Sequence, residues 1–132
     1  MIESLLALLL PHRRLLLALS LAWMVVIFTL SSQTSMQVPT LFLYQDKALH
    51  FLLFGALGFF LALLVMSDGS RPTLGHVLVV SLLVMGYGGL DEFHQSTVPG
   101  RTPDILDLAA DTAGGLLSAL LVMVILRRYA RR

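Results

Sequence analysis

Side chains that could do acid–base chemistry gather in three short stretches of the sequence. The first stretch contains Asp46, Lys47 and His50, which lie within one helical turn and can share one face of a helix. Carboxylates and imidazoles are common general acids and bases, and an ammonium group can hold a phosphate or a carboxylate. This stretch predicts one wall of a polar site.

The second stretch contains Asp91, Glu92, His94 and Gln95. Asp91, His94 and Gln95 have the i, i+3 and i+4 spacing of one helical face, provided that the preceding helix continues into this stretch. Glu92 is then expected to point elsewhere, either to Arg101 or to water. Asp91 or Glu92 is a candidate general base, with a histidine as its partner.

The third stretch contains Asp104, Asp107 and Asp111, whose i, i+3 and i+7 spacing again places them on one helical face. Asp104 could also cap the N-terminus of the helix that follows. Between the second and third stretches, residues 98–101 (Val-Pro-Gly-Arg) predict a tight turn that ends at Arg101.

The elements that must position these residues are indicated by the composition. Of 132 residues, 57% are hydrophobic and 13% are charged, whereas an average soluble domain has roughly 25% charged residues. The chain has no cysteine, which excludes disulfides, thiolate zinc sites and a cysteine nucleophile. The composition therefore predicts a membrane protein.

Four apolar stretches are long enough to cross a bilayer, which takes about 20 residues. We predict an all-α, polytopic membrane protein: a single domain over residues 1–132 with four transmembrane helices at 15–32, 48–66, 73–90 and 105–126. Residues 1–11 are predicted to form an interfacial leader that ends at Pro11. An alternative is a secretory or twin-arginine signal around Arg13 and Arg14.

The basic residues predict the orientation, because cytoplasmic loops are enriched in Lys and Arg. Only Lys47 and Arg101 belong to the loops between spans one and two and between spans three and four. The remaining seven belong to the opposite side and are Arg13, Arg14, Arg71, Arg127, Arg128, Arg131 and Arg132. We therefore expect both termini in the cytoplasm and the polar stretches at the outer face of a bacterial cytoplasmic membrane.

Small residues predict where the helices approach one another closely. Gly55 and Gly58 lie on the second span, and Ala110, Gly114 and Ser118 form a small-xxx-small row on the fourth.

Asp111 is predicted to lie about 9 Å into the fourth span, at 1.5 Å per residue. A carboxylate at that depth costs several kcal/mol unless it is paired, protonated or hydrated. It must therefore face the bundle interior or a water-filled crevice.

Together the three stretches predict an outward-facing polar pocket. The candidate catalytic residues are Asp91, Glu92, His50, His94 and Asp107. The candidate substrate-binding residues are Lys47, Arg101, Gln95, Asp46, Asp104, Asp111 and Ser32, the last from the end of the first span. We expect Asp91, His94 and Asp107 to cluster. A divalent cation held by Asp91, His94, Asp107 and His50 is a weaker alternative, because the order of acids and histidines fits no familiar metal motif.

At these residues the chain resembles the VanZ-like family of small bacterial membrane proteins, over residues 15–126. The resemblance rests on Asp46-Lys47-Ala48-Leu49-His50-Phe51, on Gly88-Gly89-Leu90-Asp91-Glu92-Phe93-His94-Gln95, on Val98-Pro99-Gly100-Arg101-Thr102 and on Asp111-Thr112-Ala113-Gly114-Gly115. It implies a link to low-level resistance to the glycopeptide teicoplanin. In many members an Asn stands where this chain has Asp111.

Three functions are consistent with this pattern. The first is binding of, or chemistry on, a lipid headgroup or a lipid-linked cell-envelope precursor, with an effect on glycopeptide susceptibility. The second is a non-enzymatic membrane protein whose charges form a structural network between helices. The third is a small ion- or proton-coupled carrier that uses the deep Asp111. The expected partners are membrane lipids and a lipid-linked or glycopeptide ligand, and not nucleic acid.

Overall fold

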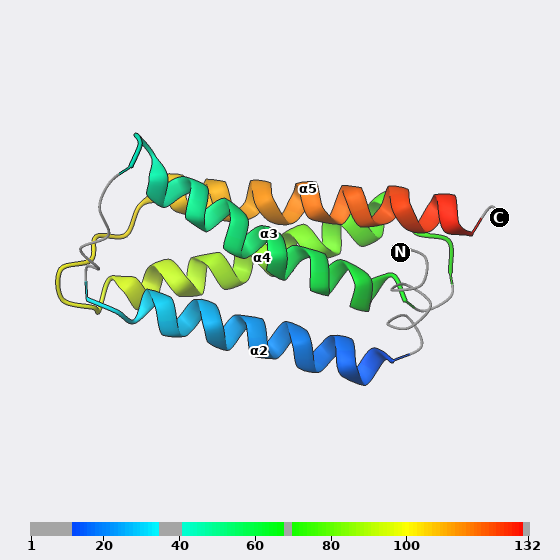
Figure 1. Ribbon diagram of the computed structural model, residues 1–132, viewed down its shortest axis with the longest axis horizontal. Helices are drawn as coiled ribbons and strands as arrows, with labels where there is room; N and C mark the ends of the chain where they lie inside the picture. The colour runs from blue at the N-terminus through cyan, green and yellow to red at the C-terminus, as the bar shows by residue number, and fades with distance from the viewer. Residues whose placement is uncertain (1–11, 35–40, 68–69, 131–132) are drawn as a thin grey trace.

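The structure is a computed structural model that describes residues 12–34, 41–67 and 70–130. The described residues form four helices and no strand (Figure 1). The helices are α2 (Arg13–Ser31), α3 (Gln45–Val65), α4 (Leu74–Gln95) and α5 (Ile105–Tyr129). The predicted leader, residues 1–11, lies outside the described residues.

Each of the four helices is long and apolar enough to cross a membrane. Their 19 to 25 residues correspond to about 28–38 Å, against a hydrocarbon core of about 30 Å. Large apolar side chains such as Val25, Leu52, Leu78 and Leu117 are exposed on the outside of the bundle. Such a surface suits lipid, where a helix satisfies its own backbone hydrogen bonds. The predicted fold class, an all-helical four-span bundle, is confirmed.

At the end that carries the polar stretches, two helices extend further than the apolar stretches that predict them. Helix α4 continues to Gln95 rather than ending near residue 90, and α3 begins at Gln45 rather than near residue 48. The polar residues of the first and second stretches therefore lie on helix rather than in loops. The i, i+3 and i+4 spacing used in their interpretation applies.

Helices α3 and α5 make the most extensive contact in the bundle, and glycines permit it. A Cβ atom at Gly58 would lie 2.6 Å from the Cα atom of Gly115, and one at Gly114 would lie 2.3 Å from the carbonyl oxygen of Phe51. The small residues of the second and fourth spans lie at a close helix contact, as expected, and the structure shows that these two spans contact each other.

Helix α2 lies at the periphery and packs mainly against α3. Two partly buried side chains attach it through hydrogen bonds. Trp23 Nε1 donates to the carbonyl oxygen of Leu53 on α3 at 2.8 Å, and the Tyr87 hydroxyl of α4 donates to the carbonyl oxygen of Met24 at 2.6 Å. These bonds fix the rotation of α2, and with it the direction in which the end of α2 points.

Successive helices run in opposite directions, so that the bundle has two distinct ends (Figure 1). The loop between α4 and α5 and the start of α3 lie at one end, together with Lys47 and Arg101. Arg13 and Arg127 lie at the other end. The three polar stretches of the sequence therefore meet at one end, while the side of the membrane to which that end belongs stays a prediction.

Candidate functional site

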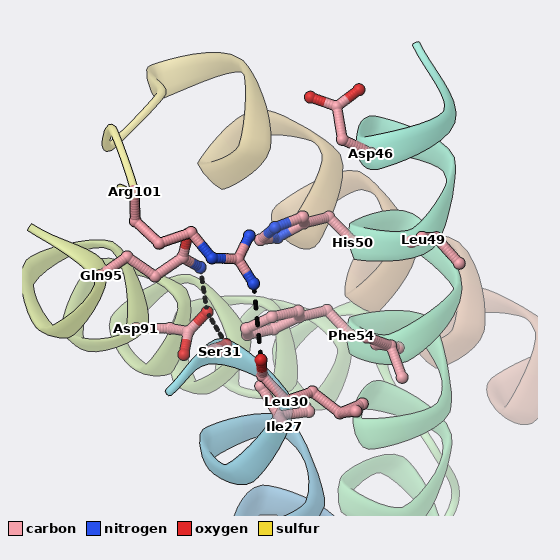
Figure 2. A pocket seen from close by; sticks show the side chains of 11 residues that line it. Ile27, Leu30, Ser31, Asp46, Leu49, His50, Phe54, Asp91, Gln95 and Arg101 are labelled. Carbon is pink, nitrogen blue, oxygen red and sulfur yellow. Dashed lines mark hydrogen bonds between the residues drawn. The ribbon is translucent and has the colours of Figure 1, made fainter. Parts of the chain in front are cut away.

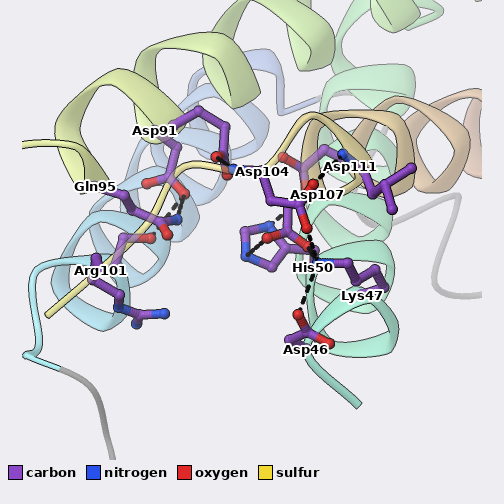
Figure 3. A network of polar contacts seen from close by, with 12 residues as sticks. Asp46, Lys47, His50, Asp91, Gln95, Arg101, Asp104, Asp107 and Asp111 are labelled. Atoms are coloured by element: carbon purple, nitrogen blue, oxygen red, sulfur yellow. Dashed lines mark hydrogen bonds and ion pairs between the residues drawn. The ribbon is translucent and has the colours of Figure 1, made fainter. Parts of the chain in front are cut away.

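The polar side chains at this end form two groups, which Figure 3 shows side by side. The group that we call the Lys47 cluster lies between α3, α4 and α5 and consists of Asp46, Lys47, His50, Glu92, Asp104, Asp107 and Asp111. The group that we call the Asp91 group lies between α2 and α4 and consists of Ser31, Asp91 and Gln95.

Lys47 is the centre of the first group. Its Nζ atom lies 2.8 Å from Asp46 Oδ2, 2.5 Å from Asp104 Oδ2 and 2.9 Å from Asp107 Oδ1. Three carboxylates surround the ammonium group, which donates hydrogen bonds to Asp46 and Asp104 and forms an ion pair with Asp107. Lys47 therefore joins α3 to α5, and it could hold a substrate only by giving up one of these ion pairs.

Asp104 connects the Lys47 cluster to the loop before α5. Its Oδ1 atom accepts a hydrogen bond from the Leu106 backbone N–H at 2.9 Å, which makes it the N-cap of α5 as predicted. Its own backbone N–H donates to Glu92 Oε2 on α4 at 2.7 Å. The hydrogen bond from the Lys47 ammonium, followed by that from Leu106, lowers the pKa of Asp104 below its usual range.

His50 is paired with the deep carboxylate. The His50 Nδ1 atom lies 2.9 Å from Asp111 Oδ1, and Asp111 has no exposed surface. A carboxylate only accepts hydrogen bonds, so Nδ1 carries the hydrogen, and in the neutral ring Nε2 has the lone pair. Nε2 faces Asp107 Oδ2 at 4.0 Å. The sequence required Asp111 to be paired, protonated or hydrated at this depth, and in the structure it is paired with His50.

Glu92 lies inside the Lys47 cluster, and the sequence-based expectation for it was wrong. Glu92 is only 8% exposed, so it does not point to water. It lies beside His50 and Asp107 rather than Arg101. Helix α4 continues past residue 90, so Asp91 and Glu92 are consecutive helical residues that point in different directions. Asp91 faces α2, and Glu92 faces α5.

The Asp91 group joins α2 to α4. Asp91 Oδ2 accepts two hydrogen bonds of 2.9 Å, one from the Ser31 hydroxyl and one from Gln95 Nε2. Asp91 and Gln95, which the spacing predicts on one helical face, are hydrogen-bonded to each other. His94 instead lies outside this group, where its Nε2 is 2.9 Å from the exposed Ser32 hydroxyl and its ring stacks on Phe28 at 4.4 Å.

The expected cluster of Asp91, His94 and Asp107 does not form. Asp91 is bonded to Ser31 on α2 and to Gln95 on α4. His94 contacts Ser32 at the end of α2, and Asp107 pairs with Lys47 on α3. Helical spacing correctly placed residues on each helix face, but it could not say how the faces of α4 and α5 are rotated against each other.

The sequence predicts that the end of the first span, Ser31-Ser32-Gln33, could form a wall of the pocket, and Ser32 is the residue assigned to the site. Ser31 is buried and bonded to Asp91, whereas Ser32 is exposed. A signal for this was present, because Leu16, Ser20, Ile27 and Ser31 recur at helical spacing and form the buried stripe of α2.

A pocket of about 270 Å³ opens between α2, α3 and α4 (Figure 2). Apolar atoms make up most of its wall, and polar groups interrupt that wall. Its lining residues are Ile27, Leu30, Ser31, Asp46, Leu49, His50, Leu53, Phe54, Asp91, Gln95 and Arg101. His50 both lines this pocket and belongs to the Lys47 cluster, so it connects the two parts of the site.

Arg101 reaches across the pocket from the loop after α4 to the end of α2 (Figure 2). Its guanidinium donates to the carbonyl oxygens of Gln33 at 3.2 Å and Leu30 at 3.4 Å. These carbonyls lie at the C-terminus of α2, where a cation is favourable. The predicted tight turn before it is confirmed by a hydrogen bond from Arg101 N to the Val98 oxygen and by Gly100, whose φ of 81° suits glycine.

Arg101 differs from Lys47 in its charge environment. No carboxylate of the described residues lies within ion-pair distance of Arg101, whereas Lys47 has three. Arg101 therefore keeps its charge available at the pocket wall. One further set, His50, Glu92 and Asp107, has the residue types and the spacing to hold a metal ion.

Four membrane-length apolar helices with a polar cluster at one end define a small multi-pass membrane protein. The family model for VanZ/LLP1 matches residues 16–127, and the chain belongs to this family. The resemblance inferred from the motifs is thereby confirmed. The comparisons with curated proteins and with solved structures found no match.

Proposed function

We propose that this protein binds the anionic headgroup of a membrane lipid, or of a lipid-linked cell-envelope precursor, in the pocket between α2, α3 and α4. The observation that carries the proposal is Arg101, a guanidinium at the pocket wall that no described carboxylate neutralises. Guanidinium groups recognise phosphates and carboxylates through paired hydrogen bonds.

The shape and lining of the pocket support a ligand that is polar at one end. Its volume of about 270 Å³ suits a headgroup rather than a whole lipid. Leu30, Leu49 and Leu53 provide an apolar wall beside the polar groups. The acyl chains of the ligand would then lie against the exposed apolar surfaces of α2 and α3, among the bilayer lipids.

We also propose that the pocket faces outward from the bacterial cytoplasmic membrane. Arg13, Arg14, Arg127 and Arg128 lie at the opposite end of the bundle, which suits the cytoplasmic side. A headgroup that belongs to an envelope precursor would then link the protein to glycopeptide susceptibility.

Arg101→Gln is expected to weaken binding of short-chain phosphatidylglycerol to the purified protein by about tenfold or more. A hydrogen bond to a charged group contributes about 1.5–3 kcal/mol, and 1.4 kcal/mol corresponds to a factor of about ten. Isothermal titration in a neutral detergent measures the dissociation constants.

The matched control is Arg128→Gln, which removes the same charge at the other end of the bundle and should leave the affinity within about twofold. Equal losses in the two variants, or equal affinity of the wild type for phosphatidylcholine, would contradict the headgroup proposal.

A structural network remains a second candidate, because the ion pairs of Lys47 join α3 to α5 and Glu92 binds the loop before α5. The carrier hypothesis has less support. The buried ionisable side chains in the described part of the chain are Asp91, Glu92, Asp107 and Asp111, which all belong to one end. A transmembrane relay needs such groups along its whole path.

A further inference from the structure

We propose that His50, Glu92 and Asp107 bind a divalent cation at the inner wall of the pocket. One ligand atom from each of the three residues lies within 4.8 Å of the others. The residues come from α3, α4 and α5, respectively, so the packing of three helices fixes the site.

The charge of the Lys47 cluster favours an additional cation. The cluster contains five carboxylates and one ammonium, which gives a formal charge of −4 when His50 is neutral. Three of these carboxylates, those of Glu92, Asp107 and Asp111, are more than nine-tenths buried. Buried charges of one sign are costly unless they are paired or coordinate a metal.

One oxygen of Glu92 points independently to a ligand. Glu92 Oε1 is buried and has no hydrogen-bond partner among the described residues. The other oxygen, Oε2, accepts the backbone N–H of Asp104, which fixes the orientation of the carboxylate. An unpartnered buried acceptor of this kind requires a donor, an ion or a water molecule.

His50 presents its lone pair to the same place. Its Nδ1–H is engaged by Asp111, which leaves Nε2 as the ligand atom, 4.0 Å from Asp107 Oδ2. Two acceptors that face one another need a cation or a proton between them. A carboxylate on the far nitrogen of a metal-binding histidine is a common arrangement that orients the ring and increases its basicity.

Lys47 does not block this position. Its ammonium pairs with Asp107 Oδ1, whereas Oδ2 is the oxygen that faces His50. Asp107 can therefore hold the lysine with one oxygen and the cation with the other.

The ligand set suits a first-row divalent ion. One imidazole nitrogen with two carboxylate oxygens matches Zn²⁺ or Mn²⁺ better than an ion that prefers oxygen ligands alone. Bond lengths of about 2.1 Å place ligand atoms about 3.4 Å apart in a tetrahedral site. Binding would therefore draw the Glu92, Asp107 and His50 side chains together by roughly 1 Å.

The test is a metal titration of the full chain in a neutral detergent after treatment with a chelator. Loss of the electron paramagnetic resonance signal of free Mn²⁺ measures binding, and Zn²⁺ competes. We expect one saturable site per chain. Glu92→Gln should weaken it at least tenfold while keeping the oxygen that accepts the Asp104 N–H. Asp111→Asn should weaken it about 10- to 100-fold through the orientation of His50.

The matched control is Asp46→Asn, which removes an exposed carboxylate from the same cluster and should change the affinity less than about threefold. Equal weakening by Asp46→Asn and Glu92→Gln would indicate diffuse attraction to acidic groups and overturn the proposal, as would the lack of a saturable site in the wild type.

A second measurement needs no variant. X-ray absorption at the zinc edge should show one imidazole among oxygen ligands, and an all-oxygen shell would overturn the assignment. Because both measurements are made without added lipid, their outcome is independent of the headgroup proposal.

Discussion

Gly114→Ala is expected to destabilise the helix bundle strongly. An alanine Cβ at this position would lie 2.3 Å from the Phe51 carbonyl oxygen and 3.0 Å from the Gly55 backbone nitrogen. Both are backbone atoms of α3, so the clash is relieved only if α3 and α5 move apart along their main contact. Overpacking of this kind costs about 1–3 kcal/mol, and more where backbone must shift. Unfolding in detergent, followed by circular dichroism, measures the loss.

Two glycines of α4 provide the control for Gly114→Ala. A Cβ at Gly86 or Gly89 would meet nothing within 4 Å. Alanine is the better helix former by about 0.8–1 kcal/mol, so Gly86→Ala and Gly89→Ala should be neutral or slightly stabilising. If these variants lose as much stability as Gly114→Ala does, the destabilisation by Gly114→Ala does not come from the α3–α5 contact.

Lys47→Met is the second substitution with a large expected effect. It removes the ammonium that Asp104 and Asp107 share and leaves Asp107, which is nearly buried, without its cation. Removing one partner of a buried ion pair costs about 3–5 kcal/mol. We expect a loss of about 3 kcal/mol in the free energy of unfolding, because Lys47 itself keeps 18% of its side chain exposed.

The control for Lys47→Met is Asp46→Asn, which breaks one ion pair whose acid is 61% exposed and should cost less than about 1 kcal/mol. An unchanged unfolding midpoint in Lys47→Met would reject the structural role of the cluster.

The stability lost in Lys47→Met should also depend on pH. The pKa of Asp104 is lowered in the folded protein, chiefly by the hydrogen bond from Lys47. Its stabilising effect is therefore complete above the ordinary Asp pKa of about 3.9 and is lost as the pH falls through the lower, folded value. The difference between wild type and Lys47→Met should be constant near neutral pH and shrink below about pH 4. A difference that grows in acid would contradict this account.

Lys47 and Arg101, which the sequence analysis grouped together as substrate-binding residues, are expected to have different roles. Substitution of Lys47 should change stability, because three carboxylates surround it. Substitution of Arg101 should change ligand affinity, because its partners are two carbonyl oxygens at the edge of the pocket. From the sequence alone both residues are cations in the same polar region.

The sequence by itself determined the four helices and the residues that each presents at one end. An apolar run of membrane length forms a helix in lipid, because a helix satisfies its own backbone hydrogen bonds. Helical spacing then places Lys47 and His50 on one face, and the depth of Asp111 requires its carboxylate to be paired, protonated or hydrated. Those inferences depend only on the local geometry of one helix.

Only the tertiary structure decided which faces meet. Neighbouring residues on a helix point about 100° apart, because a turn takes 3.6 residues. A rotation of one helix by about 100° therefore exchanges Ser31 for Ser32, or Asp91 for Glu92, at the centre of the site. Such rotations are set by long-range contacts, namely the glycine contact between α3 and α5 and the bonds that attach α2. For this reason the sequence predicted a polar end, while the separation into the Lys47 cluster and an Arg101-lined pocket came from the packing.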